Sequence, residues 1–259
     1  MFLVGALIAL AGGMGVYELH FRTDHHSTPI GLDAALGEFQ ASASSSLPGG
    51  APSTELPAPG VYSYSTTGND GVDALGGALH RYPATSTIIV TAADCGVSQR
   101  WVPLEQRADE TVTCATAGGV ELRRFTAFHQ FFGQDEREEW ECTGEPRPLD
   151  AAPGTIWTTQ CTKQRGTNDV GSVDTWSGVV VGPETATVEG ETVDVDHVTV
   201  SIATDDSRDV QVTDTWYLAG TDLVVRRVVN NSTTNGSPVG DVHYLEHVEL
   251  TLESLTPAR

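Results

Sequence analysis

From Gly60 onward the chain consists of short runs in which apolar and polar residues alternate. In the last run one parity is apolar and comprises Val242, Tyr244, Val248, Leu250 and Leu252. Alternation with a period of two predicts strands with one buried and one solvated face. Turn residues separate the runs, so we expect about a dozen strands joined mostly as hairpins. The pattern predicts a mainly β fold: a single antiparallel, strongly curved sheet that forms a half-barrel or an open barrel.

A second run shows the same alternation before the turn at residues 219–222. The expected buried parity comprises Val210, Val212, Trp216 and Leu218, and the expected wet parity comprises Gln211, Thr213, Thr215 and Tyr217. Two carboxylates, Asp214 and Glu246, fall on the apolar parities of these two runs. A buried carboxylate costs several kcal/mol unless it is paired or reaches water. Three explanations stay open: a β-bulge, an arginine partner such as Arg226 or Arg227, or a polar floor to a cavity.

The run from Val120 to Phe132 has no wet parity, so either both faces are covered or one face lines an apolar pocket. Aromatic residues of this run and of its neighbours are the candidate ligand-binding residues: Phe125, Phe128, Phe131, Phe132, Trp140, Trp176, Trp216 and Tyr244. The alternative is that these side chains form an ordinary core, because large aromatics dominate any core.

The N-terminal stretch Phe2–Tyr17 is apolar and uncharged. Its length of about 16 residues lies between that of a signal-peptide core and a full membrane span. We expect residues 1–26 to be a signal anchor, with a transmembrane helix and a juxtamembrane segment. Residues 27–59 should be a Ser/Pro/Ala-rich linker, with a short helix near Ile30–Phe39, and residues 60–259 an extracytoplasmic β domain. This layout predicts a single-pass protein of the cell membrane; the alternative is secretion after signal cleavage.

The charge is strongly negative, with 35 acidic against 14 basic residues and a net charge of -21. Such a chain repels phosphate backbones, so we expect no nucleic-acid partner. The basic residues are nearly all arginine, since Lys163 is the one lysine. Together with abundant Ala, Gly, Val and Thr, this composition is typical of a GC-rich genome such as that of an actinobacterium.

Four cysteines form two evenly spaced pairs, Cys95 with Cys114 and Cys142 with Cys161, each 19 positions apart. Four cysteines allow three pairings. Because each pair brackets one expected hairpin, we predict the disulfides Cys95–Cys114 and Cys142–Cys161. A zinc site is the alternative, but it usually needs closely spaced ligand pairs, which the sequence lacks, and we predict no metal. An even cysteine count fits an oxidising compartment.

Familiar catalytic motifs are absent from the sequence: it has no Gly-x-Ser-x-Gly elbow, no phosphate-binding P-loop and no His-Glu-x-x-His. We therefore predict a protein that is not an enzyme and uses no cofactor. The alternative is a hydrolase with an unfamiliar site, for which Glu246, Asp214 and His197 are the candidate residues.

The C-terminal segments DTWYLAGTDLVVRRVV and GDVHYLEHVELTLESLTP resemble a strand–turn–strand pattern of extracytoplasmic half-barrel lipid carriers, the lipoprotein-carrier-like group. The layout is also similar to that of membrane-anchored actinobacterial proteins. The similarity covers Val210 to Leu255. It implies a non-enzymatic envelope protein that holds a lipid or another apolar small molecule on the concave face of its sheet. The chain lacks a lipobox and carries disulfides that typical carriers do not need. The alternative is an interaction module that docks another envelope protein.

Overall fold

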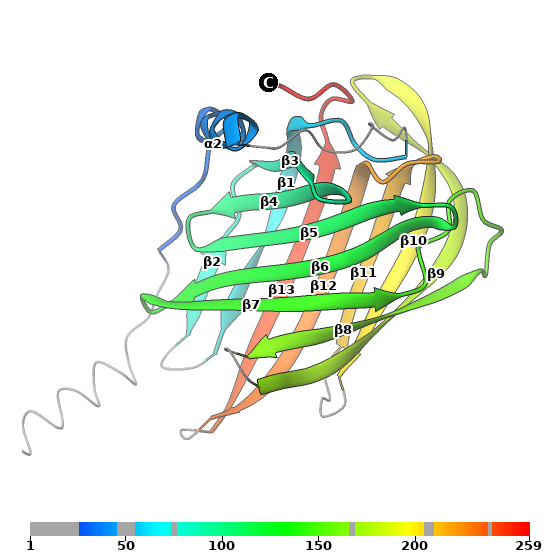
Figure 1. Cartoon of the computed structure of the whole chain (residues 1–259). Helices are drawn as coiled ribbons and strands as arrows, with labels where there is room; N and C mark the ends of the chain where they lie inside the picture. Colours follow the sequence, from blue (N-terminus) through cyan, green and yellow to red (C-terminus); the bar gives the residue numbers. More distant parts are fainter. Residues whose placement is uncertain (1–25, 46–54, 74–76, 166–168, 205–209, 238–239) are drawn as a thin grey trace, which may run out of the picture.

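The computed structural model describes residues 26–45, 55–73, 77–165, 169–204, 210–237 and 240–259. Antiparallel pairing joins its strands into one sheet, which confirms the expected mainly β class (Figure 1). The elements are helix α2 (Leu32–Ser45) and strands β1 (Gly60–Val72), β2 (Ala78–Arg81), β3 (Thr85–Ala93), β4 (Gly96–Leu104), β5 (Arg107–Thr116), β6 (Gly119–Phe131), β7 (Gln134–Gly144), β8 (Ile156–Arg165), β9 (Asp169–Val188), β10 (Glu191–Thr204), β11 (Val210–Leu218), β12 (Val224–Ser237) and β13 (Gly240–Leu252).

The sheet closes on itself, because the last strand pairs with the first. β13 runs antiparallel to β1 along residues 64–72 of β1. On its other edge, β1 pairs first with β3 and then, near its end, with β2. β1 and β3–β13 thus form a closed barrel of twelve strands. The expected half-barrel or open barrel is wrong on this point, since β1 and β13 satisfy each other's backbone groups along the seam.

One end of the barrel is filled by apolar side chains. Tyr62 and Tyr64 of β1 pack there with Leu250 and Leu252 of β13, all of them buried. The hydroxyl of Tyr64 donates a hydrogen bond to the carbonyl oxygen of Val224, at 2.8 Å. This cluster, which we call the closed core, seals the barrel at the end where β1 begins and β13 finishes.

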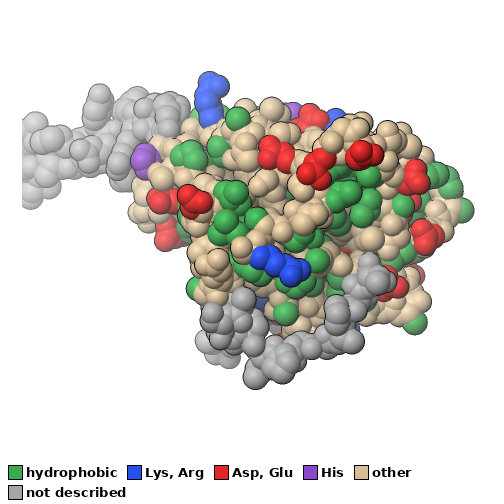
Figure 2. Space-filling model, turned by 90° about the horizontal axis from the view of Figure 1, so that it is seen from above, with side chains coloured by type: hydrophobic (Ala, Val, Ile, Leu, Met, Phe, Trp, Pro, Cys, Tyr) green, Lys and Arg blue, Asp and Glu red, His purple; other side chains and the backbone are tan. Residues whose placement is uncertain are grey.

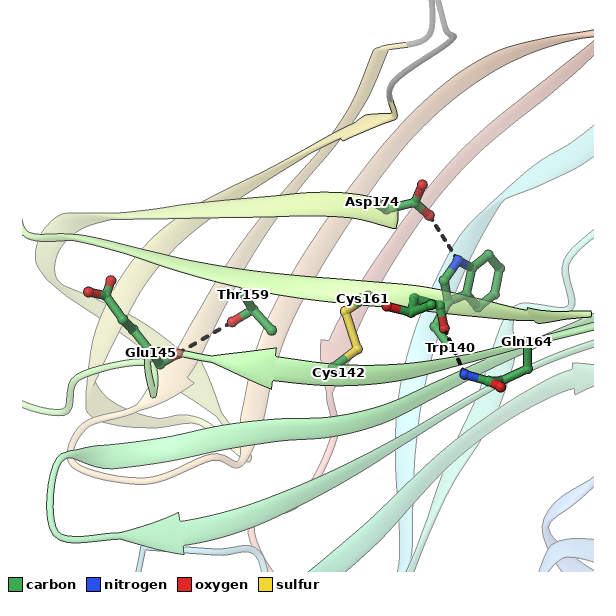
Figure 3. The surroundings of a disulfide bond; sticks show 8 residues. Trp140, Cys142, Glu145, Thr159, Cys161, Gln164 and Asp174 are labelled. Atoms are coloured by element: carbon green, nitrogen blue, oxygen red, sulfur yellow. Dashed lines mark hydrogen bonds between the residues drawn. A yellow bond between two sulfur atoms is a disulfide. The ribbon is translucent and has the colours of Figure 1, made fainter. Parts of the chain in front are cut away.

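Both predicted disulfides are confirmed. Cys95, in the turn between β3 and β4, is bonded to Cys114 of β5, and their Cα atoms are 5.3 Å apart. Cys142 of β7 and Cys161 of β8 lie directly opposite each other, with Cα atoms 4.1 Å apart (Figure 3). Each disulfide therefore ties strands of one local segment, as the spacing of 19 predicts.

Helix α2 packs against the outside of the barrel (Figure 1). Its Ala35 is fully buried in a cluster with Val61 and Ile89 of the barrel wall. Arg100 of β4 also forms an ion pair with Glu38 of the helix. Helix α2 lies where a short helix is expected, near Ile30–Phe39, and with its 14 residues it extends further into the segment expected to be a linker. The apolar positions near Ile30–Phe39 give the helix a face that the barrel covers.

The expected membrane segment Phe2–Tyr17 lies outside the described residues. Among the residues that are described, no helix is both long and apolar enough to cross a membrane.

The exterior reflects the acidic composition. Figure 2 views the end of the molecule near α2 and the C terminus, where Asp and Glu side chains appear at many points and basic side chains at few. An excess of one sign of charge favours solubility and opposes self-association.

Candidate functional site

A cavity of about 590 Å³ occupies the interior of the barrel beyond the closed core. Its wall consists mostly of inward-facing side chains from β4 to β13, together with Val72 of β1 and, from the connections between strands, Arg147 and Asp222. The volume lies within the range of about 300–1,000 Å³ that is common for small-molecule pockets. Inward positions alternate with outward ones along every strand of a barrel, so each strand contributes every second residue to this wall.

Aromatic side chains from three strands meet on one side of the cavity. The ring of Phe125 lies 5.2 Å from that of Trp140 and 5.3 Å from that of Trp176, measured between ring centroids. The indole nitrogen of Trp140 donates a hydrogen bond to Asp174 at 2.8 Å, and the Cys142–Cys161 disulfide lies beside it on the same wall (Figure 3). We call Phe125, Trp140 and Trp176 the aromatic wall.

Five of the eight candidate ligand-binding residues line the cavity. They are Phe125, Phe131, Trp140, Trp176 and Tyr244. Phe128 instead packs in the cluster beneath α2, on the outer face of β6. Phe132 lies in the turn between β6 and β7. The two faces of the run Val120–Phe132 are therefore covered differently, one by the cavity and one by the α2 cluster.

Trp216 lies on the outside of the barrel. Its ring stacks on that of His197 at 4.1 Å, and its indole nitrogen donates to Glu184 at 2.9 Å. The inward face of β11 is the polar one, comprising Gln211, Thr213, Thr215 and Tyr217. The expected orientation of β11 is thus wrong. Because the interior is partly polar, apolar residues do not mark the inward face of this strand.

Glu246 lies on the inward face of β13, as the alternation predicts, and Arg107 of β5 is its partner. The distance from the Arg107 Nη2 to the Glu246 Oε1 is 3.0 Å. The hydroxyl of Tyr82 donates to the same carboxylate at 2.6 Å. Arg107 also forms an ion pair with Asp109, with an Nη2–Oδ2 distance of 2.7 Å. Of the explanations left open by the sequence, both an arginine partner and a polar floor to a cavity therefore describe Glu246, but the partner is neither Arg226 nor Arg227.

Burial controls the protonation of this cluster. It raises the pKa of Glu246; the guanidinium of Arg107 offsets only part of that effect, and the charge of Asp109 raises the pKa further. Burial alone would lower the pKa of Arg107, but Asp109 and Glu246 more than compensate and keep it charged. Burial also raises the pKa of Tyr244 well above its usual value. The phenol therefore keeps its proton, and its hydroxyl is hydrogen bonded to the Nε2 of His129, 3.1 Å away.

A second polar cluster in the wall was missed by the sequence analysis. Asp222, in the turn after β11, accepts hydrogen bonds from Arg147 at 2.8 Å, Gln99 at 2.8 Å and Thr113 at 2.9 Å. The guanidinium of Arg147 also lies 3.8 Å from the ring centroid of Tyr217. The hairpin that carries Gln99 and Thr113, the connection with Arg147 and the turn with Asp222 are distant in the sequence, so no local spacing could have indicated the cluster.

The three candidate residues of the hydrolase alternative do not come together. Glu246 faces the cavity. His197 and Asp214 lie on the outside of β10 and β11, with 3.2 Å between the His197 Nε2 and the Asp214 Oδ1.

Comparison of the chain with protein-family models, with curated proteins and with solved structures finds no match.

Proposed function

We propose that this protein binds one apolar or amphipathic small molecule inside its barrel and is not an enzyme. The observation that carries the proposal is the cavity of about 590 Å³ with the aromatic wall on one side. Aromatic rings offer a large apolar area with few rotatable bonds, which favours retention of an apolar ligand. The resemblance of the C-terminal strands to lipid carriers supports the same function, although the barrel is closed.

We propose further that the domain works outside the cytoplasm, tethered to the membrane by its N-terminal segment. The two disulfides support this placement, since such bonds persist in oxidising compartments.

A cavity-filling variant tests the binding proposal. Val200 of β10 lines the cavity, whereas its neighbour Ser201 is exposed on the opposite face. We expect the neutral fluorescent probe N-phenyl-1-naphthylamine to bind the delipidated full-length protein saturably. Val200→Trp should abolish this binding because the indole occupies the cavity. Ser201→Trp, the matched control, should bind as the wild type does.

Thermal unfolding of both variants verifies that each is folded. Failure of the wild type to bind the probe, or equal binding by a folded Val200→Trp variant, would contradict the proposal.

A further inference from the structure

The cavity wall carries six carboxylates and four basic side chains, and one of the four basic side chains has no carboxylate partner among the described residues. Three of the four basic side chains in the wall have carboxylate partners: Arg107 has Glu246 and Asp109, Arg147 has Asp222, and Lys163 has Glu138. The fourth is Arg227 of β12, which has no ion-pair partner among the described residues.

Arg227 is also short of hydrogen bonds. Its Nε is buried and has no partner among the described residues. A buried donor without a partner costs about 1–3 kcal/mol, and more when it is charged. The guanidinium therefore presents donors and a positive charge that an anion inside the cavity would satisfy.

The position of Arg227 is at the base of the cavity, next to the closed core. In the sheet it lies opposite Leu250 of the closed core on one side and Thr215 on the other. Burial raises the pKa of Tyr64, and the charge of Arg227 offsets part of that rise, which agrees with a guanidinium close to the closed core.

The aromatic wall begins further along the strands. Following the paired residues from Trp176 through Ile202 and Gln211 leads to Asn231, four positions after Arg227 on β12. Four residues correspond to about 13 Å along a strand. The cavity thus has a cationic base and an apolar, aromatic side displaced along the barrel. At the level of this wall the Trp176 Nε1 and the Asn231 Oδ1 are also buried, and the described part of the chain offers them no hydrogen-bond partner.

We propose that the ligand is a single-chain amphiphile with one anionic head group, a carboxylate or a phosphate, held by Arg227, while its apolar chain lies against the aromatic wall. This inference rests on the proposed function and narrows its ligand class. The cavity volume suits one chain of drug-like size.

The test compares ligands that share a chain and differ in the head group: dodecanoate, dodecyl phosphate and neutral dodecanol. Each displaces N-phenyl-1-naphthylamine from the delipidated full-length protein. In the wild type we expect at least one anion to bind about 10- to 100-fold more tightly than dodecanol, as expected for charge-assisted hydrogen bonds. The preferred anion distinguishes a carboxylate from a phosphate ligand.

Arg227→Gln should remove most of that preference while leaving the affinity for dodecanol unchanged. Arg226→Gln is the matched control, because Arg226 is adjacent on β12 but partly exposed and paired with Glu249 at 2.7 Å. It should retain the wild-type preference.

The outcomes separate the two proposals. Equal binding of dodecanol and both anions by the wild type, or a preference that survives Arg227→Gln, would overturn the role of Arg227 and leave the binding function intact. Failure of all three ligands and of the probe to bind would overturn the binding function itself.

Discussion

His129 shows how the barrel interior fixes the state of a single side chain. Burial, together with the nearby charge of Arg107, holds the pKa of His129 well below its ordinary value of 6.5. The imidazole is therefore neutral near pH 7, and its Nε2 is hydrogen bonded to the hydroxyl of Tyr244. Unfolding releases it into water, where it takes up a proton below pH 6.5.

This difference predicts a pH dependence of stability. A histidine with a lowered pKa in the folded state binds its proton preferentially in the unfolded state, so stability is present above pH 6.5 and falls below it. From this group alone the loss should approach about 1.4 kcal/mol per pH unit. When urea unfolding is measured between pH 7.5 and pH 5, the free energy of unfolding of His129→Gln should fall less steeply with decreasing pH than that of the wild type. His247→Gln, at an exposed position of β13, should keep it.

If His129→Gln and the wild type lose stability in parallel over this range, then His129 is not neutral in the folded state.

At the scale of elements, helix α2 depends on the barrel that it covers. Glycine and serine within it disfavour an isolated helix of this length. Its stability must therefore come from the contact of Ala35, Leu36 and Phe39 with the outer wall. The barrel has no equivalent need of the helix, because its own strands are paired on both edges.

Two neighbouring alanines test this dependence. Ala35 is fully buried, and Ala34 is exposed. Ala35→Glu would bury an unpaired carboxylate at a cost of several kcal/mol, which should undock the helix rather than unfold the barrel. Hydrogen exchange should show lost protection in residues 32–45 and unchanged protection in the strands. In Ala34→Glu, the control, the hydrogen-exchange protection of residues 32–45 should equal that of the wild type. If Ala35→Glu also keeps the wild-type protection, then docking on the barrel does not stabilise the helix.

The same scale shows what the sequence can and cannot predict. Alternation identified the inward face of β13 correctly, because that face is mostly apolar and Glu246 is its one carboxylate. In β11 the alternation was equally clear, but it predicted that Trp216 faces the interior, whereas Trp216 lies on the outside of the barrel. A period of two separates the two faces of a strand without stating which one is inside, and a partly polar interior removes the usual guide. The disulfides were predictable because each depends on a local hairpin.

Closure of the barrel belongs to the whole molecule and left no local signal in the sequence. The seam joins β1 to β13, which are about 180 residues apart in the chain. Such pairings depend on the summed twist and tilt of all intervening strands. The Arg107–Glu246 and Arg147–Asp222 pairs were unpredictable for the same reason, since each joins residues that only the closed barrel brings together.

Gly68 tests the seam. It lies in β1 opposite Val248 with a φ of +128°, and an added Cβ would collide with the carbonyl oxygen of His247. We expect Gly68→Ala to lower the free energy of unfolding by more than about 1 kcal/mol, as measured by urea denaturation. Gly37→Ala is the control, because Gly37 lies in α2 with open space around it, and alanine there should stabilise the helix by up to about 1 kcal/mol. An unchanged stability in Gly68→Ala would mean that the seam is loosely paired.

The seam has a mechanical consequence. β1 begins beside the end of the chain, where Val61 and Ala258 exchange backbone hydrogen bonds at 2.9 Å. A force that pulls residue 60 away from residue 259 therefore acts at one end of the β1–β13 ladder and across it. Its hydrogen bonds are loaded in succession and not all at once, so the barrel opens under tension like a zipper, from the closed core toward the opposite end of the barrel.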